Sequence, residues 1–308
     1  MSESVALLTK QELRRLPETK QEEYLLLIEE ERACSPCLWP PPYNKPTLES
    51  RIRFVTECCK TWDPTPGVPD DGVTLIPDKP FIRTLCWFWH NQRMAGEQGI
   101  IRKSRRMIVS NTICALELHD AGLQRSEYHI GCQDYEDSAE MIWRPSHMYE
   151  WIQRDHPEWN LPDAKKWRGG GPHLLNKYQL PNGSLFLPLT GTDPDTFRQT
   201  GATGVRIEEG AFFARLGECL SNARLMCQGR PGTIGGLVML VSTVNGANET
   251  WKKLTKVSTP LLVAGPATPP RPVQPPKRPA KAPKSQKPTT LKEMLHEQVR
   301  AKYRKDYE

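Results

Sequence analysis

The sequence has no long apolar run and no apolar leader. None of its hydrophobic stretches approaches the roughly 18 residues that a membrane-spanning helix needs, and its opening, MSESVALLTKQELRR, lacks the apolar core of a secretion signal. Its nine cysteines are odd in number and irregularly spaced, which argues against a disulfide framework and for reduced thiols. These absences argue against membrane and secreted proteins, and we expect a soluble cytosolic protein.

What is present suits a globular protein with a mild basic excess. The chain has 308 residues, of which 37% are hydrophobic and 25% charged, so it is long enough for one large domain or two small ones. The 42 Lys and Arg residues against 36 Asp and Glu residues give a formal net charge of +6. This balance suits an anionic partner without requiring one.

The first part of the chain, residues 1–80, predicts a helical arm followed by an irregular lid region. Residues 1–33 carry two T-x-x-E capping boxes, whereas residues 34–80 are rich in proline, cysteine and Asp-Gly turns and predict loops and short irregular pieces. Cys34 and Cys37 have zinc-ligand spacing, but the adjacent Cys58 and Cys59 make an awkward second pair. The sequence does not decide whether these cysteines bind zinc.

From residue 81 to residue 258, apolar runs of strand length alternate with helix-like stretches. The runs are GIIRKS, YHIGC, SLFLPL, GVRIEE and GLVMLVST. Their alternation predicts an α/β domain in which a mostly parallel sheet lies between layers of helices. The sequence PNGS predicts a hairpin, with Asn182 and Gly183 in a type I′ turn.

The C-terminal part predicts a linker and a short helix. Residues 259–289 are crowded with proline, alanine, lysine and arginine, a composition that favours an extended and disordered tail. Residues 290–308 predict a helix with a capping box at its start. The cations of this tail either contact DNA phosphates or are simply solvated.

A basic stretch, KSRRMIVS, runs from Lys103 to Ser110 between a strand-like run and a helix-like run. A strand–loop–helix unit binds phosphate because loop amides and the helix N-terminus point at the anion. Arg105 and Arg106 add two cations there. The stretch keeps only the final hydroxyl of the usual glycine-rich phosphate motif, so a basic surface loop is the alternative.

Two adjacent acids, Glu208 and Glu209, end the apolar run GVRIEE. A carboxylate rarely lies in apolar surroundings unless it is paired, solvated or bound to a cation. In nucleotide hydrolases the first acid at such a strand end binds Mg²⁺, usually through water, and the second orients or deprotonates the attacking water. The alternative is a solvated helix N-terminus, where acids are favourable.

A third stretch, LVMLVSTVNG, ends in Ser242, Thr243 and Asn245. Small polar side chains at the carboxyl end of a strand lie next to the ligand in open α/β sheets. An ordinary turn is the alternative interpretation of this stretch alone.

In this order, the stretches KSRRMIVS, PNGSLFLPL, FRQTGATGVRIEEGAFF and VMLVSTVNG resemble the motifs of the ATPase domain of the large terminase subunit of tailed bacteriophages. The opening LTKQELRRL also looks like the start of that family. The resemblance covers roughly residues 80 to 250. It implies a P-loop, RecA-like fold that uses ATP and Mg²⁺ to translocate double-stranded viral DNA into a procapsid.

The resemblance also implies roles for individual residues. Those expected to contact the nucleotide lie along the loop and at the start of the next helix: Lys103, Ser104, Arg105, Arg106, Ser110 and Asn111. Arg105 or Arg106 would stabilise the γ-phosphate. Ser110 and Glu208 would hold Mg²⁺, and Glu209 would activate the attacking water.

Other roles follow from the same resemblance. Ser242, Thr243 and Asn245 would couple hydrolysis to movement. An upstream glutamine would bind adenine, and both Gln92 and Gln98 are candidates.

The chain departs from the family pattern at three positions. Ile108 replaces a loop glycine, Glu208 replaces the usual aspartate and Val244 replaces a proline. Ile108 lacks the conformational freedom that lets a loop glycine approach phosphate closely. We expect the three departures to affect the catalytic rate more than the fold.

Partners follow from the resemblance as well: the portal protein, a small terminase subunit and further copies of the chain in a ring, all in the host cytoplasm. Large terminases also carry a nuclease domain of well over a hundred residues, whereas about sixty residues follow the ATPase motifs here. We therefore expect no nuclease activity in this chain and a separate nuclease subunit wherever cutting is needed. The last helix either docks a partner or belongs to a solubilising tail.

Two other functions remain as alternatives. The first is a non-catalytic DNA-binding or assembly module on the same fold, for which Ile108 and Glu208 are the best support. The second is another DNA-stimulated ATPase such as a helicase, against which the lack of a second ATPase lobe counts.

Overall fold

The computed structural model describes residues 36–62, 72–96, 98–103, 108–169, 174–198, 201–227, 236–243, 248–257 and 261–263. The chain divides into two compact units, Met1–Pro266 and Ala267–Glu308, and the described residues all belong to the first. The predicted helical arm and the terminal helix lie outside them. The predicted linker, residues 259–289, lies outside them except for Leu261–Val263, which is not a disordered tail but a strand paired with Ile101–Lys103. No helix in the described ranges combines the length and the apolar character needed to cross a membrane.

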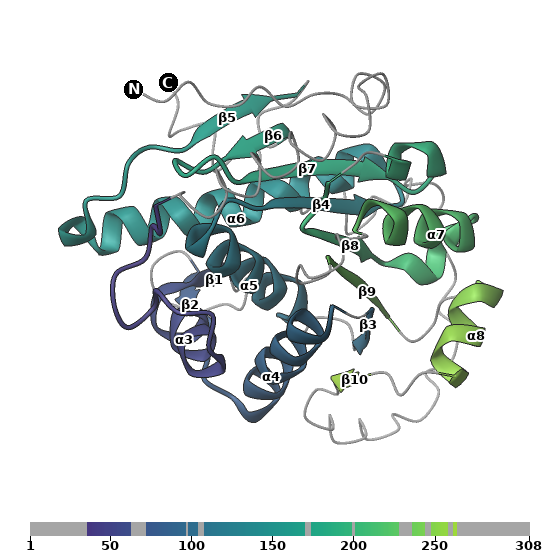
Figure 1. Ribbon diagram of the computed structural model, residues 1–308, viewed down its shortest axis with the longest axis horizontal. Coiled ribbons are helices and arrows are strands. Elements are labelled where there is room, and N and C mark those ends of the chain that lie inside the picture. Colours follow the sequence, from purple (N-terminus) through teal and green to yellow (C-terminus); the bar gives the residue numbers. More distant parts are fainter. Residues whose placement is uncertain are drawn as a thin grey trace, which may run out of the picture. The chain divides into compact units, whose positions relative to one another are not determined.

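The centre of the fold is a sheet of eight strands in the order β10-β3-β9-β8-β4-β7-β6-β5 (Figure 1). The strands are β3 (Gly99–Lys103), β4 (Glu127–Cys132), β5 (Lys165–Arg168), β6 (Leu175–Gln179), β7 (Leu185–Thr190), β8 (Gly204–Glu208), β9 (Leu237–Thr243) and β10 (Leu261–Val263). The six from β10 to β7 pair in parallel, and β6 and β5 continue the sheet antiparallel. The predicted mostly parallel sheet is confirmed.

Helices cover both faces of this sheet. The helices are α3 (Leu48–Arg53), α4 (Pro80–Ala95), α5 (Val109–Leu123), α6 (Tyr135–Asp155), α7 (Leu216–Met226) and α8 (Glu249–Val257), with single π or 3₁₀ turns at Phe54–Cys58, Pro157–Trp159, Pro194–Arg198 and Gly210–Phe212. Alternate residues of a strand point to opposite faces. In β9, Met239 packs in a core with α4, α5 and α6, whereas Leu240 packs in a second core with α7 and α8. The predicted layered α/β fold is therefore confirmed.

The region before α4 is more regular than expected. Besides loops, it contains α3, the π turn after it, and a two-stranded antiparallel ribbon of β1 (Lys60–Trp62) and β2 (Val73–Leu75). The Thr47 side chain accepts a hydrogen bond from the backbone N–H of Ser50 and caps α3. The many proline and cysteine residues predicted loops here rather than a helix. Burial of Ile52 and Phe54 in the core stabilises this short helix.

The predicted hairpin at PNGS is confirmed, but the prediction of a type I′ turn is wrong. β6 and β7 pair antiparallel. The Leu180 N–H donates to the Ser184 carbonyl, and the Leu180 carbonyl accepts from the Gly183 N–H. In the loop only Gly183 has a positive φ, at 85°, whereas a type I′ turn needs two such residues. Pro181 has its φ fixed near −65°, so the chain instead makes a three-residue loop that closes on glycine.

Asp120, at the end of α5, joins α5 to two other helices. Its Oδ1 accepts from Arg51 Nε at 3.0 Å, and its Oδ2 accepts from Trp89 Nε1 at 3.1 Å. Burial alone would raise the pKa of Asp120, but the charges of Arg51 and the bond from His119 outweigh it, so the pKa lies below its usual value. The buried pair of Arg51 and Asp120 thus fixes α3 against α5, and the bond from Trp89 fixes α4 against it.

We expect the substitution Asp120→Ala to lower the free energy of unfolding by about 3–5 kcal/mol, because it leaves the Arg51 charge buried and unpaired. Urea denaturation measures the loss. The matched control is Asp78→Ala, which removes the partner of an exposed arginine, Arg83, and should change the stability far less. Equal losses in the two variants would contradict a structural role for Asp120.

The same pair predicts a pH dependence. A carboxyl whose pKa is lower in the folded than in the unfolded chain stabilises the fold at neutral pH, and this contribution is lost as the pH falls below its unfolded value of about 4. The native chain should therefore lose unfolding free energy on acidification more steeply than Asp120→Ala. Parallel curves in denaturation experiments at several pH values would refute this.

Candidate nucleotide site

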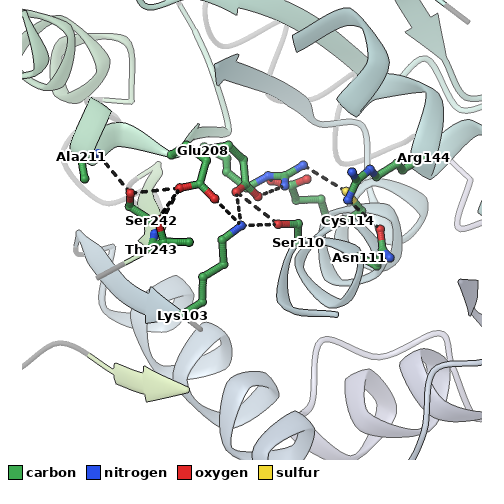
Figure 2. A network of polar contacts seen from close by, with 12 residues as sticks. Lys103, Ser110, Asn111, Cys114, Arg144, Glu208, Ala211, Ser242 and Thr243 are labelled. Carbon is green, nitrogen blue, oxygen red and sulfur yellow. Dashed lines mark hydrogen bonds and ion pairs between the residues drawn. The ribbon is translucent and has the colours of Figure 1, made fainter. Parts of the chain in front are cut away.

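The carboxyl ends of three neighbouring strands bring the predicted residues together. β9 lies between β3 and β8, so Lys103 at the end of β3, Glu208 at the end of β8 and Thr243 at the end of β9 reach the same edge of the sheet. α5 begins at Val109 and places Ser110 in its first turn. Figure 2 shows Lys103, Ser110 and Glu208 facing one another at this edge.

The Lys103 ammonium is the centre of the cluster. Its Nζ lies 2.8 Å from Ser110 Oγ, 3.1 Å from Glu208 Oε2 and 3.3 Å from Glu209 Oε1. Only 11% of the Lys103 side chain is exposed. Burial would lower the pKa of Lys103, but the charges of Glu208 and Glu209 outweigh it and raise the pKa above its usual value. The lysine is therefore held as a cation.

Glu208 is buried as an ionised carboxylate. Its side chain is 1% exposed, Oε1 accepts from an Arg206 amino group at 2.5 Å and Oε2 accepts from Ser110 Oγ at 3.2 Å. Burial works to raise the pKa of Glu208, but the charges of Lys103 and Arg206 lower it to about 2. A carboxylate in this state can hold a cation at neutral pH.

Glu209 occupies an unusual backbone conformation. Its φ and ψ of 52° and 34° are left-handed, which is uncommon for a residue other than glycine. Its Oε2 accepts from Ser242 Oγ at 3.3 Å and from Thr243 N and Oγ1, each at 3.2 Å. Such a backbone costs free energy and persists only where surrounding contacts impose it.

The two carboxylates share one arrangement. In each, one oxygen is anchored by the protein, through Arg206 for Glu208 and through Ser242 and Thr243 for Glu209, while the other oxygen faces Lys103. Glu209 is the more open of the two, with 40% of its side chain exposed. The outer oxygens can therefore meet a ligand without releasing their anchors.

The donor set fits Mg²⁺. A cation, the Lys103 ammonium, already lies among oxygens of Ser110, Glu208 and Glu209, and oxygen is the ligand that Mg²⁺ prefers. Across the ranges that the structure describes, no three His, Cys, Asp or Glu side chains group as metal ligands. A magnesium ion bound with a nucleotide needs fewer protein ligands, since phosphates and water supply the others.

Other predicted residues lie elsewhere. Asn111 was predicted to contact the nucleotide, but its Oδ1 accepts from Arg144 at 2.9 Å (Figure 2). Its Nδ2 donates to Thr61 Oγ1. Gln92 lies on α4 with its Oε1 buried, and the described part of the chain offers this atom no hydrogen-bond partner. Gln98, just before β3, accepts from Arg224 of α7. The polar contacts of the described residues join neither glutamine to the cluster.

Several predictions concern residues outside the described ranges: Ser104, Arg105, Arg106, Val244 and Asn245. Cys34, the first of the proposed zinc ligands, is among the residues not described, so the zinc hypothesis stays open. Ile108 is described and has a φ of −74°, a conformation that needs no glycine. Its side chain packs on the core.

Three buried residues behind the cluster were not predicted: Arg206, Glu117 and Cys114. Arg206 stands two positions before Glu208 on the same face of β8, and its guanidinium contacts Glu117 and Cys114 of α5. A charged residue inside an otherwise apolar strand was the available signal. The period of two along a strand would have placed its side chain beside Glu208.

Comparison with known structures finds similar folds among phage terminases. The chain resembles the large terminase of bacteriophage HK97, with a TM-score of 0.46 and 13% identity over 74% of this chain and 45% of that one. It also resembles a variant of the ATPase domain of the Thermus phage P74-26 large terminase, with a TM-score of 0.38 and 15% identity over 58% of this chain and 69% of that one. The large terminase of a further, thermophilic bacteriophage has a TM-score of 0.38 and 10% identity, over 61% of this chain and 45% of that one.

No protein-family model matches the chain, and no curated protein matches it. The match spans less than half of the HK97 terminase and of the terminase from the thermophilic bacteriophage. At these identities the similarity concerns the fold alone.

Proposed function

We propose that this chain binds ATP with Mg²⁺ at the cluster of Lys103, Ser110, Glu208 and Glu209 and hydrolyses it to move double-stranded DNA, as the ATPase of a viral packaging motor. One observation carries the proposal: the Lys103 ammonium lies within 3.3 Å of oxygens from all three other residues. These oxygens come from the helix after a basic loop and from a strand end, as phosphate and metal binding require.

In this proposal each residue has one task. Bound Mg²⁺ would neutralise negative charge on the phosphoryl oxygens, and Ser110 and Glu208 would hold it. Lys103 would turn from the carboxylates to the phosphates and form charge-assisted hydrogen bonds with them. Ser104, Arg105 and Arg106 would add contacts from the loop, and one of the two arginines would stabilise the γ-phosphate.

Glu209 would act on the attacking water. Its outer oxygen, Oε1, is the one that Lys103 leaves when the lysine turns to phosphate, while Oε2 stays bonded to Ser242 and Thr243. A base must lie within hydrogen-bond reach of the proton that it takes. Ser242 and Thr243, which anchor Glu209, are also two of the three residues proposed for coupling. Asn245 is the third.

Hydrolysis of Mg-ATP by the purified chain, measured as phosphate release with and without double-stranded DNA, tests this proposal. We expect slow turnover that requires Mg²⁺ and increases with DNA. Absence of turnover with ATP bound would refute the catalytic function. The portal protein, the small terminase subunit, a ring of identical chains and a separate nuclease are proposed partners in the assembled motor.

A non-catalytic assembly or DNA-binding module is the second candidate. Ile108 favours it, because its side chain stands where phosphate motifs use glycine to let backbone amides approach the anion. This candidate predicts DNA binding that neither ATP nor Mg²⁺ changes. An electrophoretic shift of DNA, repeated with and without Mg-ATP, separates the two.

A further inference from the structure

Arg206 lies wholly within the protein, between two carboxylates. Its side chain is 0% exposed, and the side chains of Glu117 and Glu208 are each 1% exposed. Its Nε donates to Glu117 Oε1 at 3.0 Å, and one amino group donates to Glu208 Oε1 at 2.5 Å. A guanidinium holds its donors in a rigid fork, so two carboxylates bonded to it are fixed relative to each other.

The partners of Arg206 on α5 share a helix face with Ser110. Cys114 and Glu117 follow Ser110 by four and seven positions, which places the three side chains along one stripe of the helix. The second amino group of Arg206 lies 3.1 Å from Cys114 Sγ. Arg206 therefore connects the strand that ends in Glu208 to the helix that carries Ser110.

A purely structural ion pair would need only one carboxylate. Glu117 already supplies it, yet Arg206 also bonds the oxygen of Glu208 that faces away from Lys103. That bond leaves Glu208 with a single oxygen directed at Ser110 Oγ, 3.2 Å away. Partners that fix the orientation of a metal-binding carboxylate usually change metal affinity 10- to 100-fold when removed.

We infer that Arg206, held by Glu117, is a positioning residue that presents one oxygen of Glu208 to a divalent cation beside Ser110. The inference rests on the proposed function, since the cation is the Mg²⁺ that accompanies ATP. Arg206 itself contacts neither metal nor nucleotide, and its effect is to set the geometry of the metal-side carboxylate.

The test is the Mg²⁺ concentration that gives half-maximal binding of a fluorescent ATP analogue. The main variant is Arg206→Met with Glu117→Met, which removes both partners of the buried bond with little change of volume, a replacement that buried ion pairs often tolerate. We expect the half-maximal Mg²⁺ concentration to rise about 10- to 100-fold. The affinity for the analogue at saturating Mg²⁺ should change little, which a general loss of structure would not produce.

Two further variants keep the test decisive. Ile152→Val, a substitution in the core of α6, controls for a modest loss of stability and should leave the Mg²⁺ dependence unchanged. If the double variant does not fold, Arg206→Lys replaces it, because lysine keeps the charge but lacks the fork that bonds both carboxylates. It should also raise the Mg²⁺ requirement.

The outcomes distinguish a failure of the role of Arg206 from a failure of the proposed ATP binding. A native chain that binds no ATP analogue at any Mg²⁺ concentration overturns the proposed function. Native binding together with an unchanged Mg²⁺ dependence in the folded variants overturns the role of Arg206 alone.

Discussion

Replacing Glu209 with glutamine should lower the turnover of ATP by about 10²–10⁴-fold, the usual contribution of a positioned acid–base group. Glutamine has the same shape and can keep an oxygen toward Ser242 and Thr243, which anchor Glu209 at 3.2–3.3 Å. It cannot accept a proton from water. The variant should therefore bind Mg-ATP about as well as the native chain and yet hydrolyse it very slowly.

Single-turnover hydrolysis beside equilibrium binding of ATP measures the two effects separately. The matched control is Glu218→Gln, the same chemical change at an exposed glutamate of α7 that pairs with Arg215. This control should hydrolyse ATP at the native rate. Native turnover in Glu209→Gln would remove Glu209 from the mechanism.

Replacing Lys103 with methionine should change two affinities in opposite directions. ATP should bind about 10- to 100-fold more weakly, because a hydrogen bond from a charged donor contributes about 1.5–3 kcal/mol. A divalent cation without nucleotide should bind more tightly, since the ammonium that lies among oxygens of Ser110, Glu208 and Glu209 no longer competes for them.

Titration with Mn²⁺, followed by electron paramagnetic resonance, measures the second effect, and a fluorescent ATP analogue measures the first. Lys252→Met is the control, because Lys252 is an exposed lysine on α8 that pairs with Glu249. Unchanged ATP affinity in Lys103→Met would show that the lysine does not contact phosphate. Weaker Mn²⁺ binding would show that the ammonium does not occupy the cation position.

The residues at the ends of β3, β8 and β9 were predictable because they depend on local patterns. Apolar runs that end in Lys103, Glu208 and Thr243 mark strand ends, and parallel strands bring such ends to one edge. The turn before β7 was half predictable: PNGS marks a hairpin, but the restricted φ of Pro181 selects a three-residue loop rather than a type I′ turn. Local preference thus located the turn but not its type.

The support behind the site was not predictable in the same way. The bond between Arg206 and Glu117 joins residues 89 positions apart. Arg206 lies in the run GVRIEE, but the motif gives it no role, and Glu117 lies outside the motifs. The left-handed backbone of Glu209 is likewise imposed by contacts from β9 rather than by its own preference. Such features depend on how α5, β8 and β9 pack together.

Calorimetric titration of the native chain with ATP, with and without Mg²⁺, shows whether the cluster is a magnesium–nucleotide site. We expect saturable binding of one ATP per chain that is strengthened by Mg²⁺, and loss of that strengthening in Glu208→Gln, which removes the charge of the metal-side carboxylate. Absence of ATP binding, or binding that Mg²⁺ leaves unchanged, would contradict the claim that this cluster is a magnesium–nucleotide site.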